Sequence, residues 1–186
     1  MTELRTDPIQ DEKRLIEAAR GDIAAIKPLY DRWVQPVYRF SLSRIGDPAD
    51  AEDVTSQVFL SVCRSLSDYR GKGSFGAWVF TIARNKIHDH YRKTKPWQHL
   101  DAEPQDFEFL PVEAEGSDPA ERAELRAHIG SLPENEQELL RLRYVAGLTY
   151  EEAGQVLGLS AGAARKRIFR LLARLRALME DNDEEE

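Results

Sequence analysis

Apolar residues recur at the three- and four-residue spacing of an α-helix through most of this chain, and this spacing limits its fold more than any other feature. One such stripe near the C-terminus consists of Ala164, Ile168, Leu171, Leu172, Leu175 and Met179. No segment shows the two-residue alternation of a half-buried strand. The sequence therefore predicts an all-α fold. We expect bends at Pro28 and Pro36, because an interior proline removes a backbone hydrogen bond.

Charge separates the helical pattern into blocks. The chain has a formal net charge of −7, yet residues 101–121 hold eight acidic residues and no Lys or Arg, and residues 180–186 hold six more acids. These two segments contain 14 of the 33 acidic residues. The rest of the chain therefore has 19 acidic residues and all 26 Lys and Arg residues. The helical blocks are therefore basic, which favours a polyanionic partner.

The same pattern sets the predicted domain boundaries. We predict two small helical domains, at 10–94 and 118–180. A flexible acidic linker at 95–117 should join them, because this segment is rich in proline and acids and has no periodicity. A disordered acidic tail should follow at 181–186.

Composition excludes several protein classes. Cys63 is the only cysteine, so the chain has no intramolecular disulfide and no cysteine-rich zinc site. The longest uncharged run, from Ala153 to Ala164, is too short to span a bilayer. The N-terminus lacks the apolar stretch of a secretory signal. We expect a cytoplasmic, soluble protein that needs no metal or cofactor.

The segment 148–176 has the pattern of a helix-turn-helix. Thr149 and Glu152 form a capping box at the start of a short helix. Gly158 is placed to end that helix, and Ser160 to cap the next one. In the first block, Asp47 before Pro48 predicts another capped helix start.

The second helix of this motif has a basic face opposite its apolar stripe. That face carries Lys166, Arg170 and Arg174, with Arg165 and Phe169 at its edge. Recognition helices place their N-terminal half in the DNA major groove, where Arg and Lys bond to guanine. We therefore interpret this helix as a DNA reader rather than as a merely solvated basic face.

Residues 75–93 interleave basic and aromatic side chains, a pattern that suits single-stranded nucleic acid. Phe75, Trp78 and Ile82 also have the spacing of core residues, so most of these aromatics could instead be buried. Asn85 and Asp89 are polar, four residues apart and on one helical face, which favours a binding role for them.

Three stretches together resemble bacterial alternative sigma factors of the extracytoplasmic-function (ECF) type, two-domain members of the sigma-70 superfamily. They are DAEDVTSQVF at 50–59, WVFTIARNKIHDHYRK at 78–93 and SLPENEQELLRLRYVAGLTYEEAGQVLGLSAGAARKRIFR at 131–170. The resemblance implies a dissociable subunit that binds core RNA polymerase and promoter DNA, has no enzymatic activity, and is controlled by an anti-sigma factor.

The resemblance also implies three sets of functional residues. Core polymerase would dock on Asp50, Glu52, Asp53, Gln57 and Phe59. The minus-ten element, with a base flipped from the non-template strand, would contact Tyr69, Arg70, Phe75, Arg84, Asn85, Lys86 and Asp89. The duplex minus-thirty-five element would contact Tyr150, Glu151, Ala163, Arg165, Lys166, Phe169 and Arg170.

The chain departs from the usual family pattern at three places. Ser56-Gln57 stands where Gln-Glu is usual, and Cys63 where an aromatic is usual. Both lie in the predicted docking helix. Lys166 stands where a small polar residue is usual in the recognition helix.

Two other functions fit parts of the sequence. A dimeric helix-turn-helix regulator would bind a palindromic operator, but it has no need for the 75–93 segment. An enzyme could use Asp50 and Asp53 as metal ligands. Carboxylates in a first helical turn usually stabilise the helix dipole instead, and the chain has no phosphate-binding loop.

Overall fold

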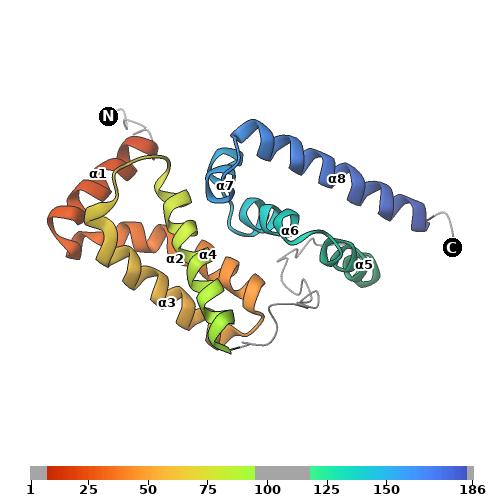
Figure 1. Ribbon diagram of the computed structural model, residues 1–186, viewed down its shortest axis with the longest axis horizontal. Helices are drawn as coiled ribbons and strands as arrows, with labels where there is room; N and C mark the ends of the chain where they lie inside the picture. Colours follow the sequence, from red (N-terminus) through yellow and green to blue (C-terminus); the bar gives the residue numbers. More distant parts are fainter. Residues whose placement is uncertain (1–7, 95–117, 184–186) are drawn as a thin grey trace, which may run out of the picture.

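The computed structural model describes residues 8–94 and 118–183. Within these ranges every element is helical and no strand occurs, which confirms the all-α class (Figure 1). The elements are α1 (Pro8–Gly21), η1 (Ile23–Ile26), α2 (Lys27–Ile45), α3 (Pro48–Ser65), η2 (Leu66–Asp68), α4 (Phe75–Thr94), α5 (Pro119–Gly130), α6 (Glu134–Leu140), η3 (Arg141–Val145), α7 (Tyr150–Leu157) and α8 (Ala161–Asp183). The predicted linker at 95–117 and residues 184–186 of the predicted tail lie outside the described residues.

Helices α2, α3 and α4 pack against one another and form the body of the first domain. Gly46 ends α2 in the left-handed conformation, with φ of 79°. The next residue, Asp47, caps α3 by accepting a hydrogen bond from the Asp50 N–H at 2.9 Å. This is the capped start that the sequence predicts, and it turns the chain back so that α3 lies along α2.

The two prolines of α2 have different positions. Pro28 stands in the first turn, after the 3-10 turn η1, where the missing N–H costs nothing. Pro36 lies inside α2, which continues to Ile45, so it does not end the helix. Trp33, Val37 and Phe40 are buried on either side of it. Their packing compensates for an interior proline, which costs about 3 kcal/mol.

The second domain contains the predicted helix-turn-helix, formed by α7 and α8. Thr149 and Glu152 make the complete capping box at the start of α7, and Gly158 ends that helix with φ of 68°. Ser160 Oγ accepts a hydrogen bond from the Ala163 N–H at 3.2 Å and so caps α8. A separate apolar cluster fixes α8 against α5 and α6; its buried members are Ile129, Leu132, Leu140, Leu171 and Leu175.

Helix α8 differs from the sequence prediction in two respects. It continues to Asp183, so residues 181–183 are helical although they were assigned to the disordered tail. No glycine or proline follows Gly162 to stop it. The spacing places Leu172 in the buried stripe, but its side chain is 42% exposed. The buried part of the helix face is therefore narrower than the apolar stripe in the sequence.

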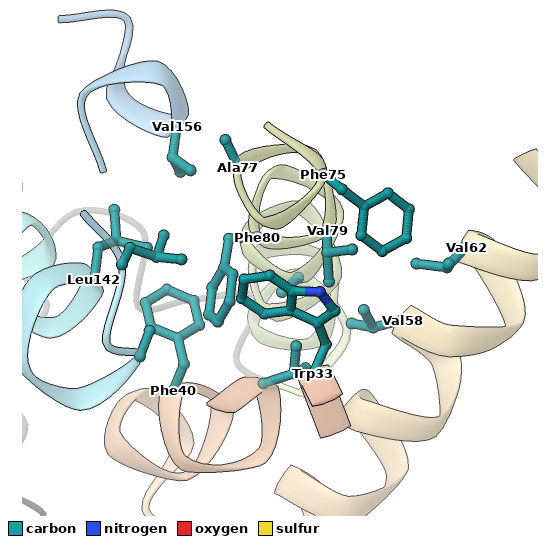
Figure 2. Packing of buried hydrophobic residues seen from close by; sticks show 14 of the residues in the cluster. Trp33, Phe40, Val58, Val62, Phe75, Ala77, Val79, Phe80, Leu142 and Val156 are labelled. Atoms are coloured by element: carbon teal, nitrogen blue, oxygen red, sulfur yellow. The ribbon is translucent and has the colours of Figure 1, made fainter. Parts of the chain in front are cut away.

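The two domains share one hydrophobic core, which the sequence did not predict. Leu142 of η3 and Val156 of α7 belong to the same buried cluster as Phe40 of α2 and Phe80 of α4. Figure 2 shows Leu142 beside Phe40 and Phe80, and Val156 close to Ala77. The described chain is therefore in a closed form, in which the two domains pack together and the helix-turn-helix contacts the first domain through α4.

Candidate nucleic-acid interface

The recognition helix α8 exposes the predicted basic face. Arg165, Lys166 and Arg170 are exposed, whereas Ala164 and Ile168 are fully buried on the other side. Phe169 is 57% exposed, with the Arg165 guanidinium 5.6 Å from its ring centre. A large exposed aromatic beside a cation offers both an apolar contact and hydrogen-bond donors, the two interactions by which base edges are read.

Two further predicted residues of α8, Ala163 and Arg174, are less available to a ligand than Arg165. Ala163, predicted to contact DNA, is half-buried at the start of α8. Arg174, predicted on the basic face, forms an ion pair with Glu136 of α6 at 3.2 Å. The basic face available to a ligand is therefore the N-terminal half of α8, whereas Arg174 helps to hold the helix on its own domain.

Tyr150 and Glu151 open α7 next to this surface. Glu151 is exposed, and Tyr150 is half-buried beneath Arg143, whose guanidinium lies 4.8 Å from the ring centre. Arg143 also donates to the Leu148 carbonyl at 2.8 Å. Arg143 was not among the predicted residues, and it positions Tyr150. The only sequence signal for it is a basic residue seven positions before Tyr150.

The capping box that starts α7 gives a stability prediction. Thr149→Ala should lower the free energy of unfolding by about 1 kcal/mol, because the Glu152 N–H loses the side chain that accepts from it at 3.2 Å. Urea denaturation followed by circular dichroism measures the loss. Thr149→Ser keeps the oxygen and should stay within about 0.5 kcal/mol of the wild type. Equal stability of Thr149→Ala and Thr149→Ser would contradict the prediction.

The predicted minus-ten aromatics support the loop before α4 rather than protrude from it. Tyr69 and Phe75 are 7% and 2% exposed, with ring centres 5.5 Å apart. The Tyr69 hydroxyl donates to the Gly73 carbonyl at 3.1 Å. Burial raises the pKa of Tyr69, with the Glu12 carboxylate acting in the same direction and Arg20 against it. The phenol thus stays a donor, and the two rings fix the shape of the loop.

Polar residues on the outer side of this region remain accessible. Arg70 precedes Gly71 on the loop and is exposed, as are Arg84 and Asn85 on α4. Lys86 is half-buried, and Asp89, also half-buried, pairs with Arg92 at 3.2 Å. The accessible part of the predicted minus-ten set is therefore Arg70, Arg84 and Asn85.

The predicted polymerase-docking residues lie on α3 and are partly accessible. Asp50, Glu52 and Asp53 are exposed, and Gln57 donates to Asp53 Oδ2 at 2.6 Å. Phe59 is only 7% exposed and packs edge-on against Tyr30, with ring centres 4.7 Å apart. The exposed apolar residues beside it are Tyr30 at 43% and Leu60 at 56%, neither of which the sequence singled out.

An ionic cluster connects the domains between these surfaces. Glu138 of α6 is 3% exposed and lies 3.3 Å from both Arg44 of α2 and Arg84 of α4. Arg44 also pairs with the exposed Glu134 at 2.9 Å, and its hydrogen bond lowers the pKa of Glu134. Burial, aided by the adjacent Arg44, lowers the pKa of Arg141 to about 10. Glu138 thus stabilises three arginines drawn from both domains.

Neither a metal cluster nor a membrane-spanning helix is found in the described part of the chain. There, no group of three or more His, Cys, Asp or Glu side chains could hold a metal ion. Asp50, one of the candidate ligands, lies 3.6 Å from His90 instead. Over 8–94 and 118–183 no helix is long and apolar enough to cross a membrane.

Comparison with known proteins gives this arrangement a family. Residues 29–96 match Sigma-70 region 2, and residues 129–177 match Sigma-70, region 4. The chain is 38% identical over 177 residues to the ECF RNA polymerase sigma factor ShbA of Streptomyces griseus. The aligned region covers 88% of this chain and 92% of the relative. The chain belongs to the ECF sigma factors. Its resemblance to that family, drawn from three sequence stretches, is confirmed.

Other relatives extend the match across most of the sigma factor. The ECF sigma factor BldN of Streptomyces coelicolor is 32% identical over 183 residues, covering 92% of this chain and 68% of the relative. Among solved structures, CnrH in complex with the cytosolic domain of CnrY has a TM-score of 0.59 at 27% identity, covering 90% of this chain and 96% of CnrH. RpoE in complex with the anti-sigma factor NepR, from Bartonella quintana, shares the fold with a TM-score of 0.59 at 21% identity, covering 83% of this chain and 96% of RpoE. The contacts assigned to single residues remain predictions.

Proposed function

We propose that this sigma factor binds core RNA polymerase and directs it to promoters by reading two DNA elements. The observation that carries the proposal is the exposed face of Arg165, Lys166, Phe169 and Arg170 on a capped recognition helix. In a helix-turn-helix this half of the second helix enters the major groove. The second domain then reads the duplex minus-thirty-five element.

The first domain, in this proposal, recognises the minus-ten element and holds the opened strand. Arg70, Arg84 and Asn85 are exposed around the loop that Tyr69 and Phe75 fix from within. Guanidinium groups neutralise phosphates, while an amide can hydrogen-bond to the edge of a base turned out of the stack. Stabilising one separated strand favours melting of the duplex.

Docking on polymerase is assigned to the outer face of α3. Its acidic residues Asp50, Glu52 and Asp53 are exposed near the start of the helix. The apolar Leu60 is exposed further along α3, and Tyr30 of α2 is exposed beside Phe59. Protein interfaces commonly combine exposed apolar residues with polar residues at the rim. The sigma factor acts in the cytoplasm, without catalytic chemistry or a cofactor, since its role is to position another enzyme.

A protein inhibitor is a further proposed partner. RpoE was solved with the anti-sigma factor NepR, and CnrH with the cytosolic domain of CnrY. An anti-sigma factor for this chain would cover the same DNA-reading and polymerase-docking surfaces. Co-purification of a small protein that dissociates when the chain binds core polymerase would support this part of the proposal.

Mapping transcript starts after overexpression tests the promoter assignment. We expect new starts preceded by two shared motifs at a fixed separation, one for each domain. A variant with Arg165 and Arg170 both replaced by alanine should lose these starts while still co-purifying with core polymerase. New starts that share no upstream motif, or that persist in the variant, would contradict the proposal.

A further inference from the structure

The two proposed DNA readers lie against each other in the described chain. The loop before α4 contacts α7: Ser74 Oγ donates to Glu152 Oε1 at 2.9 Å, and the Ser74 N–H donates to Gln155 Oε1 at 3.1 Å. A Cβ atom added at Gly73 would lie 2.7 Å from Gln155 Oε1. No room therefore remains between this loop and α7 for a nucleotide.

The second contact engages one edge of an accessible cation. Arg84, one of the accessible minus-ten residues, keeps half of its side chain exposed, but its Nε lies 3.3 Å from Glu138 Oε1. Glu152 adds another carboxylate beside the loop. Both acids come from the second domain: Glu138 engages one edge of Arg84, and the partly exposed Glu152 would repel a DNA phosphate that approaches the loop.

We propose that Glu138, Glu152 and Gln155 form a latch that holds the free sigma factor closed and covers the part of its minus-ten surface that faces α7, while Arg70 and Asn85 stay exposed. This inference rests on the proposed function, because it assigns a regulatory state to that same surface. The recognition face of α8 stays exposed in the closed chain, whereas the Ser74 face of the loop and the edge of Arg84 that pairs with Glu138 become available only when the domains separate. A partner that binds the open form more tightly shifts the population toward it.

Glu138 is the central residue of the latch because it is the buried one. Glu138 is 3% exposed, and its carboxylate lies among Arg44, Arg84 and Arg141, at 3.3, 3.3 and 3.9 Å. Without this negative charge, three guanidinium groups repel one another in the closed form. Separation of the domains relieves this repulsion, because water can then solvate them. Loss of one member of a buried ionic group is far more disruptive than loss of an exposed pair.

Energy transfer between dyes on the two domains tests the latch in the free chain. The exposed Gln35 of α2 and Ala177 of α8 are replaced by cysteine for labelling, with Cys63→Ser to prevent a third label. We expect the labelled chain to be mostly closed. Glu138→Gln should raise its open fraction at least about tenfold, because the arginines lose their buried counter-charge.

A matched control comes from the same helix and the same partner. Glu134 also pairs with Arg44, but its side chain is 77% exposed, so Glu134→Gln should change the open fraction by less than about twofold. Circular dichroism checks that Glu138→Gln keeps its helices. If Glu138→Gln loses helix content, Gln155→Ala is the variant that tests the latch. This substitution removes one exposed hydrogen bond and should raise the open fraction by roughly fivefold. An open wild type, or a folded Glu138→Gln that behaves like Glu134→Gln, would overturn the latch, as would an unchanged Gln155→Ala.

A reversible lock tests whether closure inhibits. In a Cys63→Ser chain, cysteines at Arg44 and Glu134, which meet across the domains and lie outside both DNA-reading sets, are joined by a bismaleimide that contains a disulfide, which holds the closed form until a thiol is added. We expect the locked chain to give no promoter-directed transcripts with core polymerase and the released chain to give them. A locked chain as active as the released one would contradict the inhibitory role. If neither the locked nor the released chain gave promoter-directed transcripts, the result would count against the proposed function. The energy-transfer experiment needs no promoter and would still test whether the latch exists.

Discussion

Replacing Phe80 with alanine should lower the free energy of unfolding by about 3–5 kcal/mol, the usual cost of removing a buried phenyl ring. Phe80 is fully buried, and its ring centre lies 5.3 Å from that of Phe40 and 6.1 Å from that of Trp33. Leu142 of the second domain closes the same site (Figure 2). The cavity would therefore weaken both the first domain and its contact with the second.

Urea denaturation followed by circular dichroism measures this loss. Phe169→Ala is the matched control, since it removes the same ring from a position that is 57% exposed and should change stability by less than about 0.5 kcal/mol. Near-equal effects of the two substitutions would show that the shared core does not contribute to stability as described.

The second large effect concerns DNA binding by α8. Arg165→Ala combined with Arg170→Ala should weaken binding to a duplex carrying the upstream motif at least about 30-fold, because each arginine that contacts a base contributes about 1–3 kcal/mol. Both residues are exposed on the half of the helix assigned to the major groove. Fluorescence anisotropy of a labelled duplex at a fixed salt concentration measures the change.

The control for this experiment removes the same charge elsewhere. Arg14→Ala with Arg39→Ala takes two exposed arginines from the first domain and should weaken binding no more than about threefold, through the loss of general attraction to phosphates. If both pairs weakened binding equally, the protein would hold DNA through its overall charge, and the recognition face would have no special role.

Local features of the fold were predictable because they depend on neighbours in sequence. The Asp47 cap, the Thr149–Glu152 capping box and the turn at Gly158 each involve residues within a few positions of one another. The basic face of α8 follows from helical spacing alone. The continuation of α2 through Pro36 did not follow, because it depends on packing with distant helices.

The site was predictable as a set of surfaces but not in its detailed arrangement. Spacing left open whether Phe75 is buried or exposed, and the structure buries it. The contacts of Ser74 with Glu152 and Gln155 join residues 78 and 81 positions apart. Nothing in the sequence pattern relates such residues, since a long segment separates the two domains. Three arginines gather around Glu138, and two of them lie far from it in the sequence, so no local pattern marks this residue.

The most direct test adds the purified chain to core RNA polymerase from which all sigma factors have been removed. With genomic DNA fragments as template, sequencing of the 5′ ends shows where transcription begins. The sigma factor account predicts that adding the chain concentrates starts at a limited set of positions, each preceded by the same two motifs. A distribution of starts that is identical with and without the chain would contradict it.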